Sequence, residues 1–131
     1  MHSILLVDDD EDILFLLREM LEDEGYRVET SVTGRGALEK ARGNSYDVIF
    51  VDYMLADIKG DVLAGELKRM DSSATIFYLT GCRLPKDELM KTAAVRDVLV
   101  KPVTCDSLLA MVRGALDAPA VGNEPLAVDE R

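Results

Sequence analysis

Two periodic patterns of apolar and polar positions alternate along the chain. Short apolar or strictly alternating runs indicate buried strands, and longer segments with apolar residues three or four positions apart indicate amphipathic helices. The expected strands are residues 3–7, 26–32, 46–51, 75–79 and 98–100. The expected helices are residues 13–21, 33–42, 61–70 and 85–94, followed by a last helix that Thr104 caps. The pattern therefore predicts five strands and five helices in strict alternation.

Strands that alternate with helices at this spacing favour an α/β fold with one parallel sheet. Right-handed crossovers place the helices on both faces of such a sheet, so a doubly wound, five-stranded architecture is expected. The length of 131 residues suits a single domain, which we assign to residues 1–117. Residues 118–131 contain Pro119, Gly122 and Pro125 and are expected to be a short C-terminal tail or linker.

Charge and composition exclude several classes of function. The formal net charge is -10, so direct binding of nucleic acid is not expected. The sequence has neither a signal peptide nor an apolar stretch long enough for a bilayer, which predicts a cytoplasmic protein without membrane insertion. Cys82 and Cys105 are far apart and form no metal or redox motif, so both are expected to be free thiols.

Five consecutive acidic residues, Asp8 to Asp12, follow the first expected strand. Negative charge is favoured in the first turn of a helix, which accounts for Glu11 and Asp12. It does not account for Asp8 and Asp9, which lie at the carboxyl end of the strand, where open α/β sheets bind ligands. Two interpretations remain for this pair: a metal site, or acids that are solvated or cap the helix.

Polar residues also end three other expected strands. Asp52 follows the third strand, Thr80 the fourth and Lys101 the fifth, and in a parallel sheet these ends share one edge with Asp8 and Asp9. Three carboxylates near one point require a cation, and oxygen ligands suit Mg²⁺. Lys101 could pair with Asp52 or with an incoming phosphoryl group. Carboxylates can accept phosphoryl groups, so the pattern is typical of phosphoryl chemistry.

In these motifs the chain resembles the receiver domain of two-component response regulators, with a single-domain, chemotaxis-regulator-like organisation. The resemblance covers residues 3 to about 117 and rests on Leu5-Leu6-Val7-Asp8-Asp9-Asp10, Asp47-Val48-Ile49-Phe50-Val51-Asp52, Gly60, Leu79-Thr80-Gly81 and Val100-Lys101-Pro102. It implies a flavodoxin-like fold, and phosphorylation of Asp52 by a histidine kinase or histidine phosphotransfer protein. It further implies a signalling module that catalyses only its own phosphorylation and dephosphorylation.

The resemblance also assigns roles within the site. It implies that Asp9, Asp52 and the backbone carbonyl of Met54 bind Mg²⁺, and that Asp8 contributes through water. Thr80 would donate a hydrogen bond to the phosphoryl group and Lys101 would contact it. In the family the bond before the proline after this lysine is commonly cis, although trans is the default for a proline met in a sequence.

Four positions depart from the family pattern. Val98 stands where an aromatic switch residue is usual, so the family's coupling from Thr80 to the outer face is in question. Ala56 replaces a frequent proline. Met54 and Cys82 are expected to flank the phosphoryl group, and because neither can orient an attacking water well, we expect slow dephosphorylation.

Three classes of function follow from these observations. The leading one is a phosphorylation-dependent module that changes its binding to a downstream protein target, with phosphorylation-dependent homodimerisation left open. A second is a Mg²⁺-dependent phosphohydrolase, which the apolar Met54 and the absence of a substrate-covering cap argue against. The third is a degenerate receiver that acts as a constitutive interaction or dimerisation domain, which Val98 keeps under consideration.

Overall fold

The computed structural model describes residues 1–81 and 85–117 and contains the predicted alternation of strands and helices. The strands are β1 (Ser3–Val7), β2 (Arg27–Ser31), β3 (Val48–Asp52), β4 (Thr75–Thr80) and β5 (Val95–Val100). The helices are α1 (Glu11–Asp23), α2 (Gly34–Gly43), α3 (Gly60–Met70), α4 (Lys86–Leu89) and α5 (Cys105–Asp117). The predicted tail, residues 118–131, and Cys82 lie outside the described residues.

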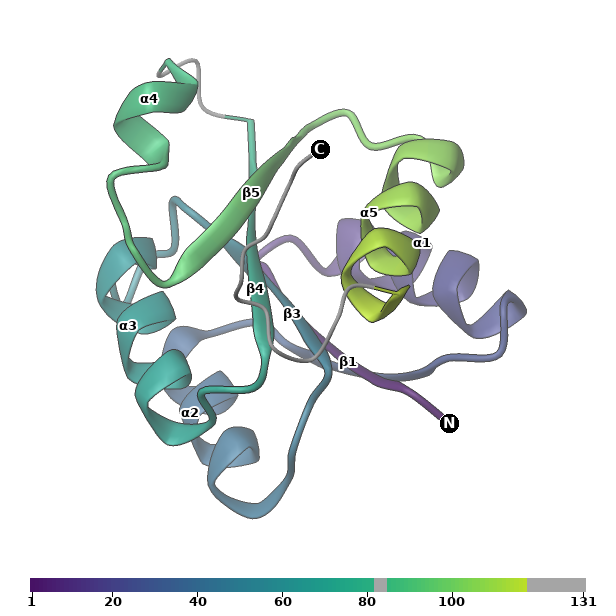
Figure 1. The fold of residues 1–131 in the computed structure, drawn as a ribbon, viewed down its shortest axis with the longest axis horizontal. Coiled ribbons are helices and arrows are strands. Elements are labelled where there is room, and N and C mark those ends of the chain that lie inside the picture. The colour runs from purple at the N-terminus through teal and green to yellow at the C-terminus, as the bar shows by residue number, and fades with distance from the viewer. Residues whose placement is uncertain (82–84, 118–131) are drawn as a thin grey trace.

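All five strands form one parallel sheet in the order β2-β1-β3-β4-β5. Helices α1 and α5 lie on one face of this sheet, and α2, α3 and α4 lie on the other (Figure 1). The strand order reverses between β1 and β3, because the chain first moves outward to β2 and then crosses back. The predicted doubly wound α/β fold is therefore confirmed.

Alternating strand residues supply two separate cores. Ile4 and Leu6 pack with residues of α1 and α5, whereas Leu5 and Val7 pack with residues of α2 and α3. Every residue of β3 is buried, which explains why its sequence is an apolar run without alternation. Packing on both faces of the central strands therefore holds their carboxyl ends in a fixed position.

Local signals at the ends of α1 agree with the sequence. The Asp10 side chain caps the helix by accepting hydrogen bonds from the backbone N–H groups of Asp12 and Ile13, at 3.0 and 3.3 Å. At the other end, Gly25 has a φ of 92°, a conformation that side-chain-bearing residues seldom adopt. These two signals set where α1 begins and where it ends.

The boundary between the fourth helix and the fifth strand differs from the prediction. The helix expected over 85–94 ends at Leu89, and the strand expected over 98–100 already begins at Val95. The Thr92 side chain and the Tyr78 hydroxyl form a hydrogen bond of 2.5 Å, which holds the intervening turn against β4. Val95 is buried beside Ile76, so the chain enters the sheet where its alanines favoured a helix.

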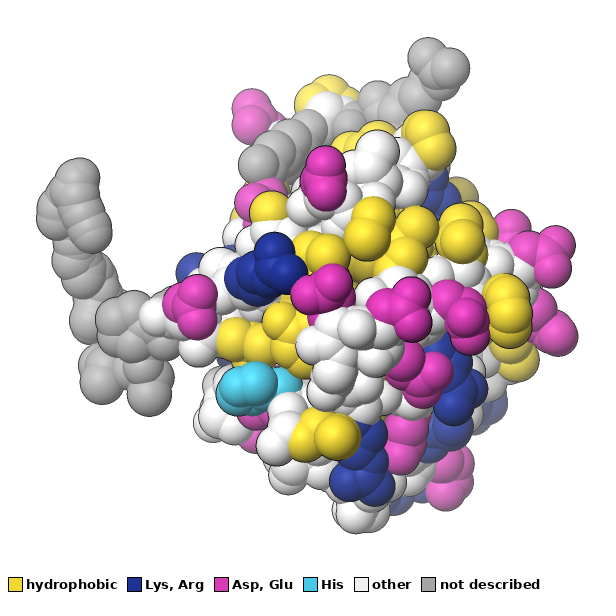
Figure 2. Space-filling view, turned by 90° about the vertical axis from the view of Figure 1, so that its right-hand side faces the viewer, with side chains coloured by type: hydrophobic (Ala, Val, Ile, Leu, Met, Phe, Trp, Pro, Cys, Tyr) yellow, Lys and Arg dark blue, Asp and Glu magenta, His cyan; other side chains and the backbone are white. Residues whose placement is uncertain are grey.

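The face over α1 and α5 has acidic side chains scattered among basic and apolar ones (Figure 2). Two large apolar side chains of α1, Phe15 and Leu16, are more than half exposed. Within residues 1–81 and 85–117, no helix combines the length and the apolar composition that crossing a membrane requires.

Candidate functional site

The site lies where the strand order reverses. Asp8 directly follows β1 and Asp52 ends β3, and these neighbouring strands pair from Ile4 with Val48 to Val7 with Val51. Both carboxylates are buried, at 0% and 4% residue exposure. The carboxyl ends of strands beside such a reversal are the usual ligand-binding edge of an open α/β sheet.

A third carboxylate completes an acidic cluster. One oxygen from each of Asp8, Asp9 and Asp52 lies within 4.8 Å of the others, and the Asp9 side chain is exposed to solvent. The structure thus brings together the three carboxylates that the sequence placed at one edge of the sheet. The cluster therefore has two buried walls and one face open to water.

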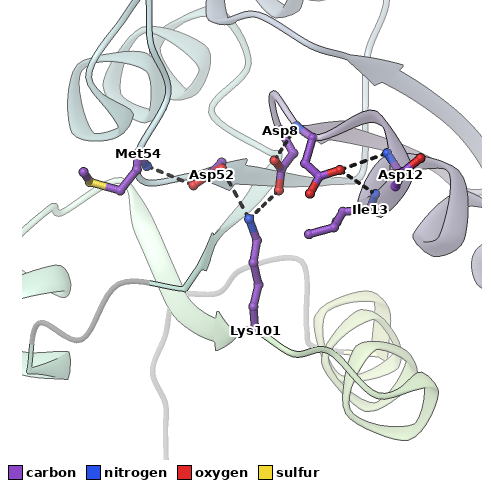
Figure 3. A network of polar contacts seen from close by, with 7 residues as sticks. Asp8, Asp12, Ile13, Asp52, Met54 and Lys101 are labelled. Carbon is purple, nitrogen blue, oxygen red and sulfur yellow. Dashed lines mark hydrogen bonds and ion pairs between the residues drawn. The ribbon is translucent and has the colours of Figure 1, made fainter.

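Lys101 reaches into the cluster from the end of β5. Its Nζ atom lies 2.8 Å from Asp8 Oδ2 and 3.4 Å from Asp52 Oδ2, so it lies between the two buried carboxylates (Figure 3). The sequence indicated Asp52 or a phosphoryl group as its partner. The shorter ion pair is with Asp8, a partner that the sequence interpretation did not name.

Burial and charge shift the pKa values of this pair. Burial raises the pKa of Asp8, and the charge of Asp52 acts in the same direction, against the Lys101 ammonium and the Asp10 N–H group. Although its own burial acts the other way, the contacts with Asp8 and Asp52 raise the pKa of Lys101. Lys101 therefore stays charged at neutral pH.

The loop after β3 folds back on the acceptor strand. Asp52 Oδ1 accepts a hydrogen bond of 2.9 Å from the Met54 backbone N–H, while the Met54 side chain is 63% exposed. Gly60 is buried where the loop closes, and a Cβ atom there would lie 2.8 Å from both Cα and O of Tyr53. Only a glycine allows this close approach, which places the backbone of Met54 beside the cluster.

Thr80 and Pro102 occupy the expected edge. Thr80 is fully buried at the end of β4, and its carbonyl accepts a hydrogen bond of 2.8 Å from the Lys101 backbone N–H. The Lys101–Pro102 bond is cis, as the family resemblance implied. Val98 is partly buried against the core on the α2 and α3 face, and it pairs with Tyr78 in the sheet.

Two further contacts of the site escaped the sequence interpretation. Asp8 Oδ1 accepts a hydrogen bond of 2.9 Å from the Asp10 N–H, which fixes the direction of the buried carboxylate. In the loop after β3, the Asp57 carboxylate binds two backbone N–H groups at the start of α2. The capping tendency of aspartate was a usable signal for the first contact, but no local signal pairs Asp57 with a helix 22 residues away.

The donor set fits a hard divalent cation. Three carboxylates face one ammonium, so two negative charges remain uncompensated at close range. Among the described residues, the buried Asp8 Oδ2 has no hydrogen-bond partner besides the Lys101 ammonium at 2.8 Å. Oxygen ligands with an open, solvated side match the preference of Mg²⁺, which keeps several waters.

Comparison with known proteins gives consistent matches over this region. Residues 4–113 match the family model of the response regulator receiver domain. The response regulator ArlR of Staphylococcus saprophyticus is 32% identical over 120 residues, which cover 88% of this chain and 53% of ArlR. The transcriptional regulatory protein ZraR of Escherichia coli is 32% identical over 116 residues, covering 87% of this chain and 26% of ZraR. The chain thus spans about half or less of these two curated relatives.

Solved structures give the same result. A CheY-like receiver domain protein of Methanospirillum hungatei has a TM-score of 0.84 at 28% identity, covering 89% of this chain and 94% of that one. The response regulator TrrA of Thermotoga maritima, solved in complex with Mg²⁺-BeF, has a TM-score of 0.80 at 32% identity, covering 88% of this chain and 99% of TrrA. With the sheet order and the family match, these likenesses show that the chain belongs to the receiver domain family of two-component response regulators.

Proposed function

We propose that this chain is a phosphoacceptor module in which Asp52 receives a phosphoryl group and thereby alters binding to another protein. The observation that carries the proposal is the buried Asp52 carboxylate, held by the Met54 N–H on one oxygen and facing the Lys101 ammonium on the other. A carboxylate fixed in this way can attack phosphorus. A P–O bond to Asp52 forms as the P–N bond of a phosphohistidine breaks, and the departing imidazole takes up a proton from solvent.

The neighbouring residues support the transfer in distinct ways. Asp8, Asp9, Asp52 and the Met54 carbonyl would hold Mg²⁺, with Asp8 acting through water, and the ion would neutralise charge on the phosphoryl oxygens. Lys101 already lies between Asp8 and Asp52 and would pair with the incoming phosphoryl group. The Thr80 hydroxyl, at the end of the adjacent strand, would donate a hydrogen bond to it. These groups act only on the chain's own phosphorylation and dephosphorylation.

The phosphoryl donor would be a histidine kinase or a histidine phosphotransfer protein. This assignment is supported by the family and by the open, solvated side of the acidic cluster, where Asp9 is exposed. The downstream target is a protein of unassigned identity, and phosphorylation-dependent dimerisation stays a prediction. Because an intact acceptor cluster is present, a constitutive interaction domain is not the favoured function.

Intact mass measurement tests the acceptor. We expect the native chain to gain one phosphate when it is incubated with Mg²⁺ and either acetyl phosphate or a phosphorylated histidine phosphotransfer protein. The Asp52→Asn variant should show no gain, and omission of Mg²⁺ should also prevent it. The Asp61→Asn variant is the matched control, because Asp61 is an exposed aspartate in the first turn of α3. A native chain that gains nothing from either donor, or an unchanged gain in Asp52→Asn, would overturn the proposal.

The exposed Met54 side chain predicts a long-lived phosphorylated state. Its thioether cannot direct a water toward phosphorus, whereas an amide at the same position can do so. We therefore expect Met54→Asn to release phosphate about 10-fold faster than the native chain, as followed by decay of the phosphorylated mass. Met70→Asn is the control, since Met70 is an exposed methionine at the far end of α3. Equal decay in all three proteins would contradict this explanation.

A further inference from the structure

Asp57 makes an unusual long-range cap on helix α2. Its Oδ1 accepts a hydrogen bond from the Gly34 N–H and its Oδ2 accepts one from the Arg35 N–H, both at 2.9 Å. The helix already has a local cap, because Thr33 Oγ1 accepts a 2.9 Å hydrogen bond from the Gly36 N–H. Asp57 therefore satisfies two N–H groups that the local cap leaves over, and it joins the loop after β3 to a helix 22 or 23 residues away.

The fit between this loop and the helix is close. Gly34 is buried, and a Cβ atom at that position would lie 3.1 Å from the Ile58 Cβ and 3.3 Å from Asp57 Oδ1. Ile58 in turn packs against the core on the α2 and α3 face. The two hydrogen bonds from Arg35 and Gly34 lower the pKa of Asp57, so its carboxylate is charged at neutral pH and is favoured by the helix dipole.

The same loop carries the backbone of Met54. At its base, Gly60 lies against Tyr53, and the Met54 N–H is bonded to Asp52. The loop between Tyr53 and Gly60 contains no proline, and Ala56 stands where proline is frequent in the family. Leu55 and Ile58 of this loop pack against the core, and Asp57 adds the two hydrogen bonds that join the loop to the start of α2.

We propose that Asp57 is a positioning residue that holds the Met54 carbonyl in place for the metal through its two hydrogen bonds to the start of α2. This inference rests on the proposed function, because it assigns a role to Asp57 at the same metal site. Within the described residues, the Asp57 carboxylate accepts its hydrogen bonds from Gly34 and Arg35 of α2 and not from the acidic cluster. It acts by fixing the tip of the loop three residues beyond Met54, so that the carbonyl is presented without further ordering.

The experiment measures Mg²⁺ affinity by calorimetric titration of the full chain. The Asp57→Ala variant should bind Mg²⁺ about 10-fold more weakly, at the lower end of what loss of a supporting contact costs a metal site. Asp57→Asn should fall between the native chain and Asp57→Ala, because one amide oxygen can still accept one of the two hydrogen bonds. The matched control is Thr33→Ala, which removes a hydrogen bond of the same length from the same helix turn without touching the loop.

Amide hydrogen exchange gives a second readout that a purely structural cap would leave unchanged. The Met54 N–H should exchange faster in Asp57→Ala, whereas Thr33→Ala should leave it at the native rate. An unchanged Mg²⁺ affinity in Asp57→Ala, or an equal loss in Thr33→Ala, would overturn the positioning role while the acceptor function of Asp52 stands. A native chain that binds no Mg²⁺ and gains no phosphate would overturn both, and that result is recognised without any variant.

Discussion

Replacement of Lys101 by methionine is expected to lower the free energy of unfolding by about 3 kcal/mol in the absence of divalent ions. Its ammonium is the cation that lies between Asp8 and Asp52, and the Asp8 carboxylate is fully buried. Removal of one partner leaves a buried charge uncompensated, which costs far more than the net stabilisation of an exposed ion pair. Urea denaturation of both proteins, followed by circular dichroism, measures the difference.

Addition of Mg²⁺ should then reduce the difference in the free energy of unfolding between Lys101→Met and the native chain. The ion would replace the missing positive charge, and without the ammonium nearby it would be repelled less. Lys91→Met is the control, because Lys91 pairs at 3.0 Å with Glu88 while both side chains are more than half exposed. That variant should lose less than about 0.5 kcal/mol. A similar loss of unfolding free energy at both lysines would mean that the ion pair of Lys101 with the buried Asp8 stabilises the protein no more than an exposed ion pair.

Gly60→Ala is expected to damage both stability and phosphorylation. The new Cβ atom would lie 2.8 Å from two backbone atoms of Tyr53 and 3.1 Å from the Asp52 carbonyl oxygen. Backbone cannot turn aside as a flexible side chain can, so we expect a loss of about 3 kcal/mol, at the upper end for an overpacked site. The loop that carries Met54 must shift, and phosphorylation by acetyl phosphate should slow by about 100-fold.

A second glycine of the same helix provides the control for this substitution. Gly65 lies in the middle of α3, and a Cβ atom there would meet nothing within 4 Å. Gly65→Ala should therefore stabilise the protein by about 0.5 to 1 kcal/mol, because alanine loses less conformational freedom than glycine in a helix. Chemical denaturation should show a lower free energy of unfolding for Gly60→Ala and a higher one for Gly65→Ala than for the native chain. Stabilisation by both would show that the backbone near Tyr53 moves away at little cost.

The sequence predicted the parallel sheet correctly because its central strands are buried on both faces. An uninterrupted apolar run such as β3 has few other interpretations when helices flank it. The prediction was wrong where β5 begins, because Arg96 and Asp97 interrupt the apolar pattern on an edge strand. There, an exposed charge on Arg96 costs little, and the tertiary contact of Thr92 with Tyr78 overrides the helical tendency of Ala93 and Ala94, which follow Thr92.

The candidate site was predicted as far as strand ends allow. Asp8, Asp9 and Asp52 meet because the ends of β1 and β3 are adjacent in the sheet. The sequence placed these ends at one edge of a parallel sheet, whereas the adjacency of β1 and β3 comes from the strand order. The closer pairing of Lys101 with Asp8 depends on differences of less than an ångström, and residue order carries no such information. Likewise, the hydrogen bonds of Asp57 depend on how a loop meets a helix across the fold.

The separation of the site residues along the chain affects the rate at which the folded molecule unfolds. Asp52 and Lys101 are 49 positions apart, and Asp8 comes from a third strand, so the cluster exists only after distant segments have found their register. Such long-range pairings form late in folding, because closing long loops costs entropy before the contacts compensate for it. An ion held by the finished cluster would have little to bind in the transition state. It would therefore prolong the life of the native molecule without hastening its formation.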